Sequence, residues 1–509
     1  MQFLLLTMSV CYSKLYVLLK FVRGVTMLVC ELSPKEVFYY FQKLASIPRG
    51  SGNTDQIAEY CMEFASENGL RARRDKANNV ILFAEGTPGY ERSDPVILQA
   101  HLDMVCEKEE GCGLDMEKDG LELCTDGVTV WARGTTLGGD NGIAVAYILA
   151  VLASDTIAHP PIEALFTSDE EIGMLGARAL DAGDLTAKRL INMDSEEEGV
   201  LCVSCAGGVR AHCSIPFSVE RTNRALGCAY RIEVSRLLGG HSGVEIHKQR
   251  ENAVKLLGNV LASASRACTL SLVCASGGGK ENAIPKTAQA TVCVPLNQAH
   301  MLEYSVKEFL ILMHHELSTT EPELLITAKP TNMPEQCMDQ ESSRRLIFAL
   351  QQIPDGMQKM SPEIEGMVQT SLNLGTLRTE SGHVQLRYLI RSNTASGNQL
   401  LLERVTAFVE YLGGSVVMQS DYPAWEYRIK SKLRETMIRT FEEVYNKAPE
   451  VTAIHAGLEC GILAGKIMDI DMVSFGPTLS DVHTPKESMD VASVRRSWKY
   501  LIKVLENLR

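Results

Sequence analysis

Three consecutive acidic side chains are the first feature of this sequence that points to chemistry. They are Asp169, Glu170 and Glu171, and they follow the apolar run of the segment LFTSDEEIG. Adjacent like charges repel one another, and a bound metal cluster would supply the compensating positive charge. Taken alone, the same acids are also explained as solvated charges at the start of a helix, where the macrodipole favours them.

Further polar residues stand at the ends of apolar runs elsewhere in the chain. They are His101 and Asp103 in LQAHLDMV, Asp140 in TTLGGDNG, Asp194 in INMDSEEEG and His483 in PTLSDVHTPKE. Two imidazoles and several carboxylates without a thiolate suit one or two borderline divalent cations, such as zinc, manganese or cobalt. Singly, Asp140 is explained as a helix cap and His101 as a core histidine. Their recurrence in five separate segments favours a metal site.

The elements that must position these residues alternate between strand and helix. The segments VILQAHLDMV, ALFTS and RLINMD predict buried strands, and GIAVAYILAVLAS predicts a buried helix. Such alternation predicts an α/β sheet with helices on its faces. Because ligands bind beyond the carboxyl ends of strands in these sheets, most of the polar residues should gather at one edge.

The chain is long enough for two domains. At 509 residues it exceeds the size at which single cores stop growing, roughly 250 to 300 residues. The texture changes over residues 208–424, which predict an inserted α+β domain, whereas residues 27–207 and 425–509 together predict the first domain. Residues 1–26 are apolar but interrupted by lysine and arginine, typical of neither a signal peptide nor a spanning helix. We expect them to be an extension outside the folded domains.

Composition excludes several classes of partner. The formal net charge is −13 and no basic stripe is present, so nucleic acid is not expected to bind. The 15 cysteines are scattered, odd in number and without a CxxC pair. This usage is typical of reduced thiols in a cytoplasmic protein that does not enter a membrane.

The motifs HLD, GGDNG, SDEEIG, MDSEE and DVHTPKE, in this order, resemble a known group of enzymes. They are similar to the di-zinc metallopeptidase clan of aminoacylases, carboxypeptidases and bacterial dipeptidases. The nearest likeness is to its branch of aminoacyl-histidine dipeptidases, also called peptidases D or Xaa-His dipeptidases. The resemblance runs from Met27 to Arg509 and includes SLNLGTLRTESGHVQLRYLIRS and IHAGLECGIL. It implies a mixed-sheet α/β catalytic domain with an inserted lid domain.

The resemblance also implies a set of metal ligands. Two divalent ions are expected in each subunit, zinc in the first place, with manganese or cobalt as alternatives. Asp140 would bridge the two ions, His101 and Asp194 would complete one site, and Glu171 and His483 would complete the other.

Other residues of the same motifs would act around the ions. Glu170 would be the general base, and Asp103 would hold the ring of His101 in its metal-binding tautomer. The resemblance further implies a cis peptide bond between Asp140 and Asn141.

Substrate contacts are implied for the inserted domain and the segment near residue 459. His241 in LLGGHSGVEIH would stabilise the oxyanion, and Asn282 in GGGKENAIPKTA would bind substrate. Arg391 in YLIRS would bind the substrate's terminal carboxylate, because its planar fork suits that group. Glu459 in HAGLECG is either a partner of the free amine or an acid on a helix face. Without the resemblance, His241 is explained as a turn residue and Arg391 as a surface charge.

The resulting hypothesis is metal-dependent hydrolysis of unblocked dipeptides, with a preference for Xaa-His substrates such as β-alanyl-histidine. Two alternatives remain open: a tripeptide aminopeptidase or N-acyl amino acid deacylase on the same scaffold, and a non-catalytic metal-binding scaffold. Oligomeric state is left open between a monomer and a homodimer.

Overall fold

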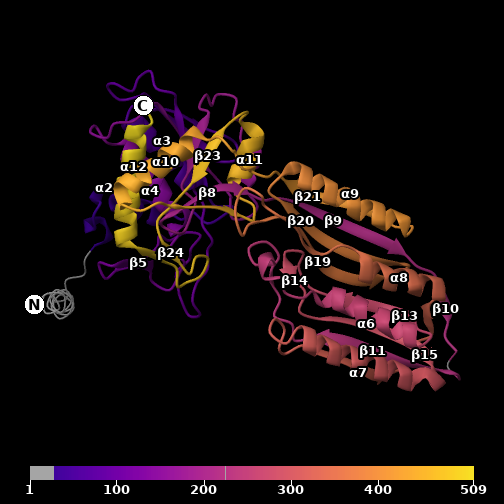
Figure 1. Ribbon diagram of the computed structural model, residues 1–509. Coiled ribbons are helices and arrows are strands. Elements are labelled where there is room, and N and C mark those ends of the chain that lie inside the picture. The colour runs from indigo at the N-terminus through magenta and orange to yellow at the C-terminus, as the bar shows by residue number, and fades with distance from the viewer. Residues whose placement is uncertain (1–27, 224) are drawn as a thin grey trace, which may run out of the picture. The chain divides into compact units, whose positions relative to one another are not determined.

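The computed structural model describes residues 28–223 and 225–509 (Figure 1). The predicted extension, residues 1–26, therefore lies outside the described residues. The chain divides into two compact units. The first unit holds the chain up to Val203, Arg428–Thr452 and Ile462–Arg509, and the second unit holds Ser204–Tyr427 and Ala453–Gly461.

An eight-stranded mixed sheet forms the centre of the first unit. In order across the sheet, its strands are β1 (Arg71–Arg74), β2 (Val80–Ala84), β6 (Ile162–Thr167), β3 (Val96–His101), β7 (Arg189–Asn192), β23 (Asp471–Ser474), β8 (Val200–Cys205) and β22 (Glu450–Ile454). The neighbours β6, β3, β7 and β23 run parallel. Every residue of β3 and β6 is buried, as expected for mainly apolar parallel strands that helices cover.

Helices of two kinds pack in the first unit. Helix α4 (Gly139–Leu152) is apolar on all sides, and most of its residues are buried, as expected for a helix inside a core. The other long helices are amphipathic: α2 (Lys35–Ala45), α3 (Asp55–Glu67), α10 (Lys432–Tyr445) and α12 (Val491–Asn507). The side chain of Asp490 caps α12 by accepting from Ser493 N at 2.5 Å. Two short helices, α5 (Leu175–Ala179) and α11 (Glu459–Lys466), complete the set.

A small antiparallel sheet carries a loop that matters for the site. Its strands, in order, are β24 (Leu479–Ser480), β25 (Ser488–Asp490), β5 (Thr129–Ala132) and β4 (Leu123–Thr125). The connection between β24 and β25 contains residues 481–487, and β25 pairs with β5. Both ends of this loop are therefore fixed by the sheet.

The second unit is built on a nine-stranded sheet whose pairs are all antiparallel. Its strands are β16 (Leu325–Thr331), β11 (Gly227–Ser235), β15 (Ala288–Pro295), β13 (Ser271–Gly277), β19 (Val368–Glu380), β20 (His383–Ser392), β9 (Gly207–Pro216) and β21 (Ser415–Tyr422), with β18 (Gly356–Met360) beside β19. Helices α6 (Ala253–Ala267), α7 (Ala299–Glu316), α8 (Gln340–Gln352) and α9 (Ala395–Tyr411) lie along it (Figure 1). Two-stranded ribbons join β12 (Gly240–His241) to β14 (Ala283–Ile284), and β10 (Val219–Arg221) to β17 (Gln336–Met338).

The predicted alternation of strands and helices is confirmed, and so is an α/β fold with an inserted α+β part. The predicted junctions at 207/208 and 424/425 lie four and three residues from the unit boundaries at 203/204 and 427/428. One assignment differs: residues 453–461, predicted in the first domain, group with the second unit. The reason is visible in His455, which hydrogen-bonds both Ser371 and Asn393 of that unit.

Candidate active site

Parallel strands bring most of the predicted residues to one edge of the sheet in the first unit. In β3 and β6, His101 pairs with Thr167, and the acids of residues 169–171 follow directly. The neighbouring strand β7 ends at Asn192, two residues before Asp194. Asp140 joins them from the first turn of α4, and His483 from the loop between β24 and β25. The predicted clustering at the carboxyl ends of the strands is thus confirmed.

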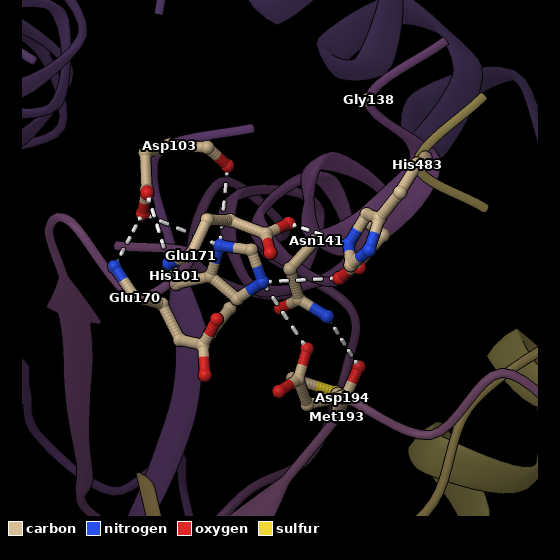
Figure 2. Close-up of polar contacts among 12 residues, drawn as sticks. His101, Asp103, Gly138, Asn141, Glu170, Glu171, Met193, Asp194 and His483 are labelled. Atoms are coloured by element: carbon tan, nitrogen blue, oxygen red, sulfur yellow. Dashed lines mark hydrogen bonds and ion pairs between the residues drawn. The ribbon is translucent and has the colours of Figure 1, made fainter. Parts of the chain in front are cut away.

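The two histidines of this cluster face the two oxygens of one carboxylate. Asp140 Oδ1 lies 3.0 Å from His101 Nε2, and Asp140 Oδ2 lies 3.1 Å from His483 Nε2. His101 Nε2 also lies 3.3 Å from Asp194 Oδ1, and His483 Nε2 lies 2.9 Å from Glu171 Oε1. The Nε2 atom of each histidine therefore contacts Asp140 and one further carboxylate. Figure 2 shows Asp194 beside His101.

These contacts define three sets of side chains whose donor atoms lie within 4.8 Å of one another. The sets are His101, Asp140 and Asp194; Asp140, Glu171 and His483; and His101, Glu170 and Glu171. Imidazole and carboxylate donors at this spacing fit borderline divalent cations. Asp140, His101 and Glu171 each belong to two of these sets. The peptide bond between Asp140 and Asn141 is cis, as the resemblance implied.

The electrostatics of the cluster show a surplus of negative charge. Burial lowers the pKa of His101, but Asp194, Asp103 and Asp140 outweigh that effect and raise it well above its usual value. Hydrogen bonds to Asp140 and Glu171 raise the pKa of His483 to about 10. Burial raises the pKa of Asp194 to about 6, and its contact with His101 offsets only part of the rise. The carboxylates thus favour positive charge beside them, which protons on the imidazoles or bound cations would supply.

Asp103 links the histidine to the acid pair. Its backbone oxygen lies 3.1 Å from His101 Nδ1, so the other ring nitrogen, Nε2, points at Asp140 and Asp194. Its carboxylate accepts from Glu170 N at 3.0 Å and from Glu171 N at 3.3 Å (Figure 2). The buried Asp103 therefore fixes both the ring orientation and the backbone of the acids.

A pocket of about 590 Å³ opens beside Glu171 in the first unit. Its walls are formed by residues 50–53, 104–106 and 116–118, together with Glu171 and Ile172. Because Glu171 belongs to the cluster, a molecule in this pocket reaches the same edge of the sheet.

The second unit holds a different group of polar residues. Arg391, on β20, is buried and donates from Nη1 to the hydroxyl of Tyr422 at 2.6 Å. His241 Nδ1 accepts from the backbone of Gly243 at 3.1 Å and of Val244 at 3.2 Å, so the ring proton resides on Nε2. Burial and the nearby Arg391 lower the pKa of His241. His241 is therefore a neutral imidazole that presents an N–H donor.

A buried histidine that the sequence analysis did not single out belongs to the same group. His455 donates from Nδ1 to Asn393 Oδ1 at 3.2 Å and accepts at Nε2 from Ser371 Oγ at 2.8 Å. Burial, Arg391 and His241 lower its pKa to about 3. The motif IHAGLECGIL contained this residue, but nothing in its spacing distinguishes it from a core histidine. Tyr422 was missed as well, because it lies outside all the motifs that the sequence analysis considered.

The remaining predicted residues also lie in the second unit. Asn282 is exposed, and its backbone oxygen accepts from Ser242 N at 2.9 Å, next to the ribbon that carries His241. Glu459 is buried at the first residue of α11.

Comparisons with known proteins bear on this geometry. Residues 97–507 match the model of peptidase family M20/M25/M40. The chain is 36% identical over 478 residues to the cytosol non-specific dipeptidase of Escherichia coli K12, covering 94% of this chain and 98% of that relative. The crystal structure of aminoacylhistidine dipeptidase from Vibrio alginolyticus matches with a TM-score of 0.90 and 37% identity, over 94% of this chain and 97% of that one.

A more distant match supports the fold alone. The aminopeptidase PepT of Bacillus cereus is 15% identical, with a TM-score of 0.54 over 94% of this chain and 99% of that one. The predicted relationship to metallopeptidases and the predicted binding of divalent metal are both confirmed at the level of the family. The chain belongs to peptidase family M20/M25/M40, and it is a metallopeptidase, an enzyme that hydrolyses peptide bonds with the help of bound divalent metal.

Proposed function

We propose that the protein is a dipeptidase that cleaves unblocked dipeptides, with Xaa-His substrates such as β-alanyl-histidine among those it prefers. The observation that carries the proposal is the position of Asp140 between two histidines, each with a further carboxylate. The names of the two relatives add support, since one is a non-specific dipeptidase and the other an aminoacylhistidine dipeptidase.

We assign the metal ligands as follows. His101 and Asp194 would hold one ion, Glu171 and His483 would hold a second, and Asp140 would be a ligand shared by both. Zinc is the first candidate because the donors are nitrogen and oxygen, and manganese or cobalt share that preference. Ions bound by these residues would supply Lewis acidity for the scissile carbonyl.

Glu170 is assigned as the general base. It accepts a proton from the attacking water and passes it to the leaving amine. Its backbone is fixed by Asp103, and its carboxylate lies in one set with His101 and Glu171. Adjacent carboxylates thus divide between a ligand and a proton carrier, which is the reason for the acid pair.

The second unit supplies the groups that recognise the rest of the substrate. His241 donates from Nε2 to the oxyanion, a role that its neutral tautomer supports. Arg391 binds the carboxylate at the end of the dipeptide, because it is a buried cation whose Nε has no hydrogen-bond partner among the described residues. Asn282 and Glu459 are assigned to the substrate's backbone and free amine.

Hydrolysis of a substrate panel tests the proposal. The panel holds β-alanyl-histidine, ordinary dipeptides, their N-acetylated forms and tripeptides, assayed after chelation and after zinc, manganese or cobalt is restored. We expect metal-restored cleavage of unblocked dipeptides. The variant Glu170→Ala should lose about 10² to 10⁴ in kcat while it still binds metal.

The alternatives give different results in the same assay. Faster cleavage of tripeptides would indicate an aminopeptidase, and faster cleavage of acetylated substrates would indicate a deacylase. If bound metal supported no hydrolysis of any substrate, the dipeptidase assignment would be wrong and the scaffold hypothesis would replace it.

Location and assembly remain proposals as well. The relative from E. coli is named a cytosolic enzyme, which supports a cytoplasmic location. Among the described residues, no helix has both the length and the apolar character that crossing a membrane requires. A homodimer stays a prediction, and light scattering after size exclusion would test it.

A further inference from the structure

A buried carboxylate outside the ligand set grips the turn that carries Asp140. Glu487 is 2% exposed, and its Oε2 accepts from Leu137 N at 2.9 Å and from Gly138 N at 3.1 Å. Its Oε1 accepts from Gly139 N at 2.8 Å and from Asp140 N at 3.3 Å. Four successive backbone N–H groups therefore converge on one side chain, an arrangement that satisfies the charge of a buried carboxylate.

The position of Glu487 in the chain gives this contact its meaning. Glu487 closes the loop between β24 and β25, four residues after His483. The same loop thus contributes one histidine to the cluster and, through Glu487, holds the backbone of Asp140. His483 and Asp140 are 343 positions apart in sequence, and their atoms Nε2 and Oδ2 lie 3.1 Å apart.

A second buried side chain holds the same turn from the other direction. Arg49 donates from Nη1 to the backbone oxygens of Leu102 at 2.9 Å and Asp103 at 3.1 Å, directly after His101. Its Nη2 donates to the backbone oxygen of Gly138. The turn before Asp140 is thereby tied to the end of β3 as well as to the loop of His483.

The turn has no room for adjustment. Gly138 has a φ of +63°, and a Cβ there would lie 2.5 Å from Arg49 Nη2 and 2.6 Å from Met104 Sδ. Only glycine fits this conformation and this close approach without displacement of a neighbour. The backbone of Asp140 is consequently set by Glu487 and Arg49 rather than by packing alone.

We propose that Glu487 is a positioning residue for metal binding, which aligns the carboxylate of Asp140 with the imidazole of His483. The proposal rests on the ligand assignment made for the proposed function. Glu487 contacts the loops of both Asp140 and His483, but neither His101 nor Asp194. The site made by Asp140, Glu171 and His483 should therefore depend on Glu487 more than the other site does.

Metal binding by the full-length protein tests this inference. The variant Glu487→Gln keeps the shape of the side chain, but its amide NH₂ would face two backbone N–H donors and lose their hydrogen bonds. We expect calorimetric titration of the metal-free protein with zinc to show two equivalents in the wild type. In the variant, the affinity for one equivalent should fall 10- to 100-fold, as loss of a residue behind metal ligands usually causes.

The matched control is Glu163→Gln. Glu163 is also buried in the first unit, and it also accepts from backbone N–H groups, those of Thr186 at 2.9 Å and Ala187 at 3.2 Å. It lies in β6, in register with Ile97 near the start of β3 rather than with the end that bears His101. The control should lower the melting temperature and leave both zinc affinities unchanged.

Each outcome decides the inference. Unchanged zinc affinity in folded Glu487→Gln, or an equal loss in both variants, would overturn it, because the residue would then serve stability alone. If Glu487→Gln does not fold, Glu487→Asp keeps the charge on a shorter stem and should show a smaller loss at the same equivalent. Replacing zinc by cobalt adds a visible absorption spectrum, which should change for one of the two ions only. Failure of the wild type to cleave dipeptides would refute the proposed function but leave this comparison of affinities intact.

Discussion

The same residue type takes opposite electrostatic roles in the two units. In the first unit, carboxylates surround His101 and His483 and raise the pKa of both rings. In the second unit, burial and the cation of Arg391 lower the pKa of His241 and His455. One cluster is therefore prepared for cations and the other for an anion. The proposed dipeptidase would use both properties, since it would bind metal ions and a substrate that carries a carboxylate.

The largest effect is expected from removing Asp140, the residue that the two proposed sets of metal ligands share. Asp140→Ala removes both oxygens that face the histidines, so neither set of ligands stays complete. Loss of metal assistance worth several kcal/mol should reduce kcat/KM by about 10³ or more. Metal analysis of the purified variant should show less than one ion per chain.

A surface residue provides the control for that experiment. Asp155 is exposed shortly after the end of α4, and Asp155→Ala should retain both metal and activity. Full metal content in Asp140→Ala would contradict the assignment of Asp140 as the bridging ligand.

The candidate metal site of the first unit could be predicted largely from the sequence, because its geometry follows from a simple rule. Parallel strands end at a common edge, so residues placed after separate strands, such as His101 and Asp194, must meet there. The pairing of Asp140 with His483 needed the family resemblance, since neither residue follows a strand of the parallel core.

The group formed by Arg391, His241 and His455 in the second unit could be predicted only in part. Its members meet across an antiparallel sheet and a segment near residue 455, where contacts depend on register and on long-range packing. Ser371 lies opposite Arg391 in the pairing of β19 with β20, and no periodic pattern announces that. Glu487 was overlooked within a quoted motif, because bonds to backbone N–H groups leave no trace in sequence. Residues 453–461 group with the second unit, where His455 forms its hydrogen bonds, and chain continuity gives no sign of this.

A second experiment tests the carboxylate-binding role proposed for Arg391. Arg391→Lys keeps a positive charge but loses the planar fork that pairs with a carboxylate. Hydrogen bonds to charged groups contribute about 1.5 to 3 kcal/mol, so kcat/KM for dipeptides should fall about 10- to 100-fold. The amide of the same dipeptide, which lacks the carboxylate, should be cleaved at an unchanged rate.

The exposed Arg387 on the same strand supplies the matched control. Arg387→Lys should leave kcat/KM for both substrates at the wild-type value. An equal loss for dipeptide and amide in Arg391→Lys would contradict a role in carboxylate recognition and would indicate a structural role instead.

The smallest expected effect is the pH dependence that His455 gives to the stability of the protein. The folded pKa of His455 is about 3, below the value near 6.5 of an unfolded chain, so between these values the unfolded state binds more protons. Stability due to neutral His455 is therefore complete above pH 6.5 and is lost progressively as the pH falls toward 3.

Urea denaturation should show that wild type loses about 1 kcal/mol more than His455→Asn between pH 7 and 5.5. The exposed His247 serves as control, and His247→Asn should keep the wild-type slope. Identical slopes in wild type and His455→Asn would mean that burial and Arg391 do not hold this ring neutral.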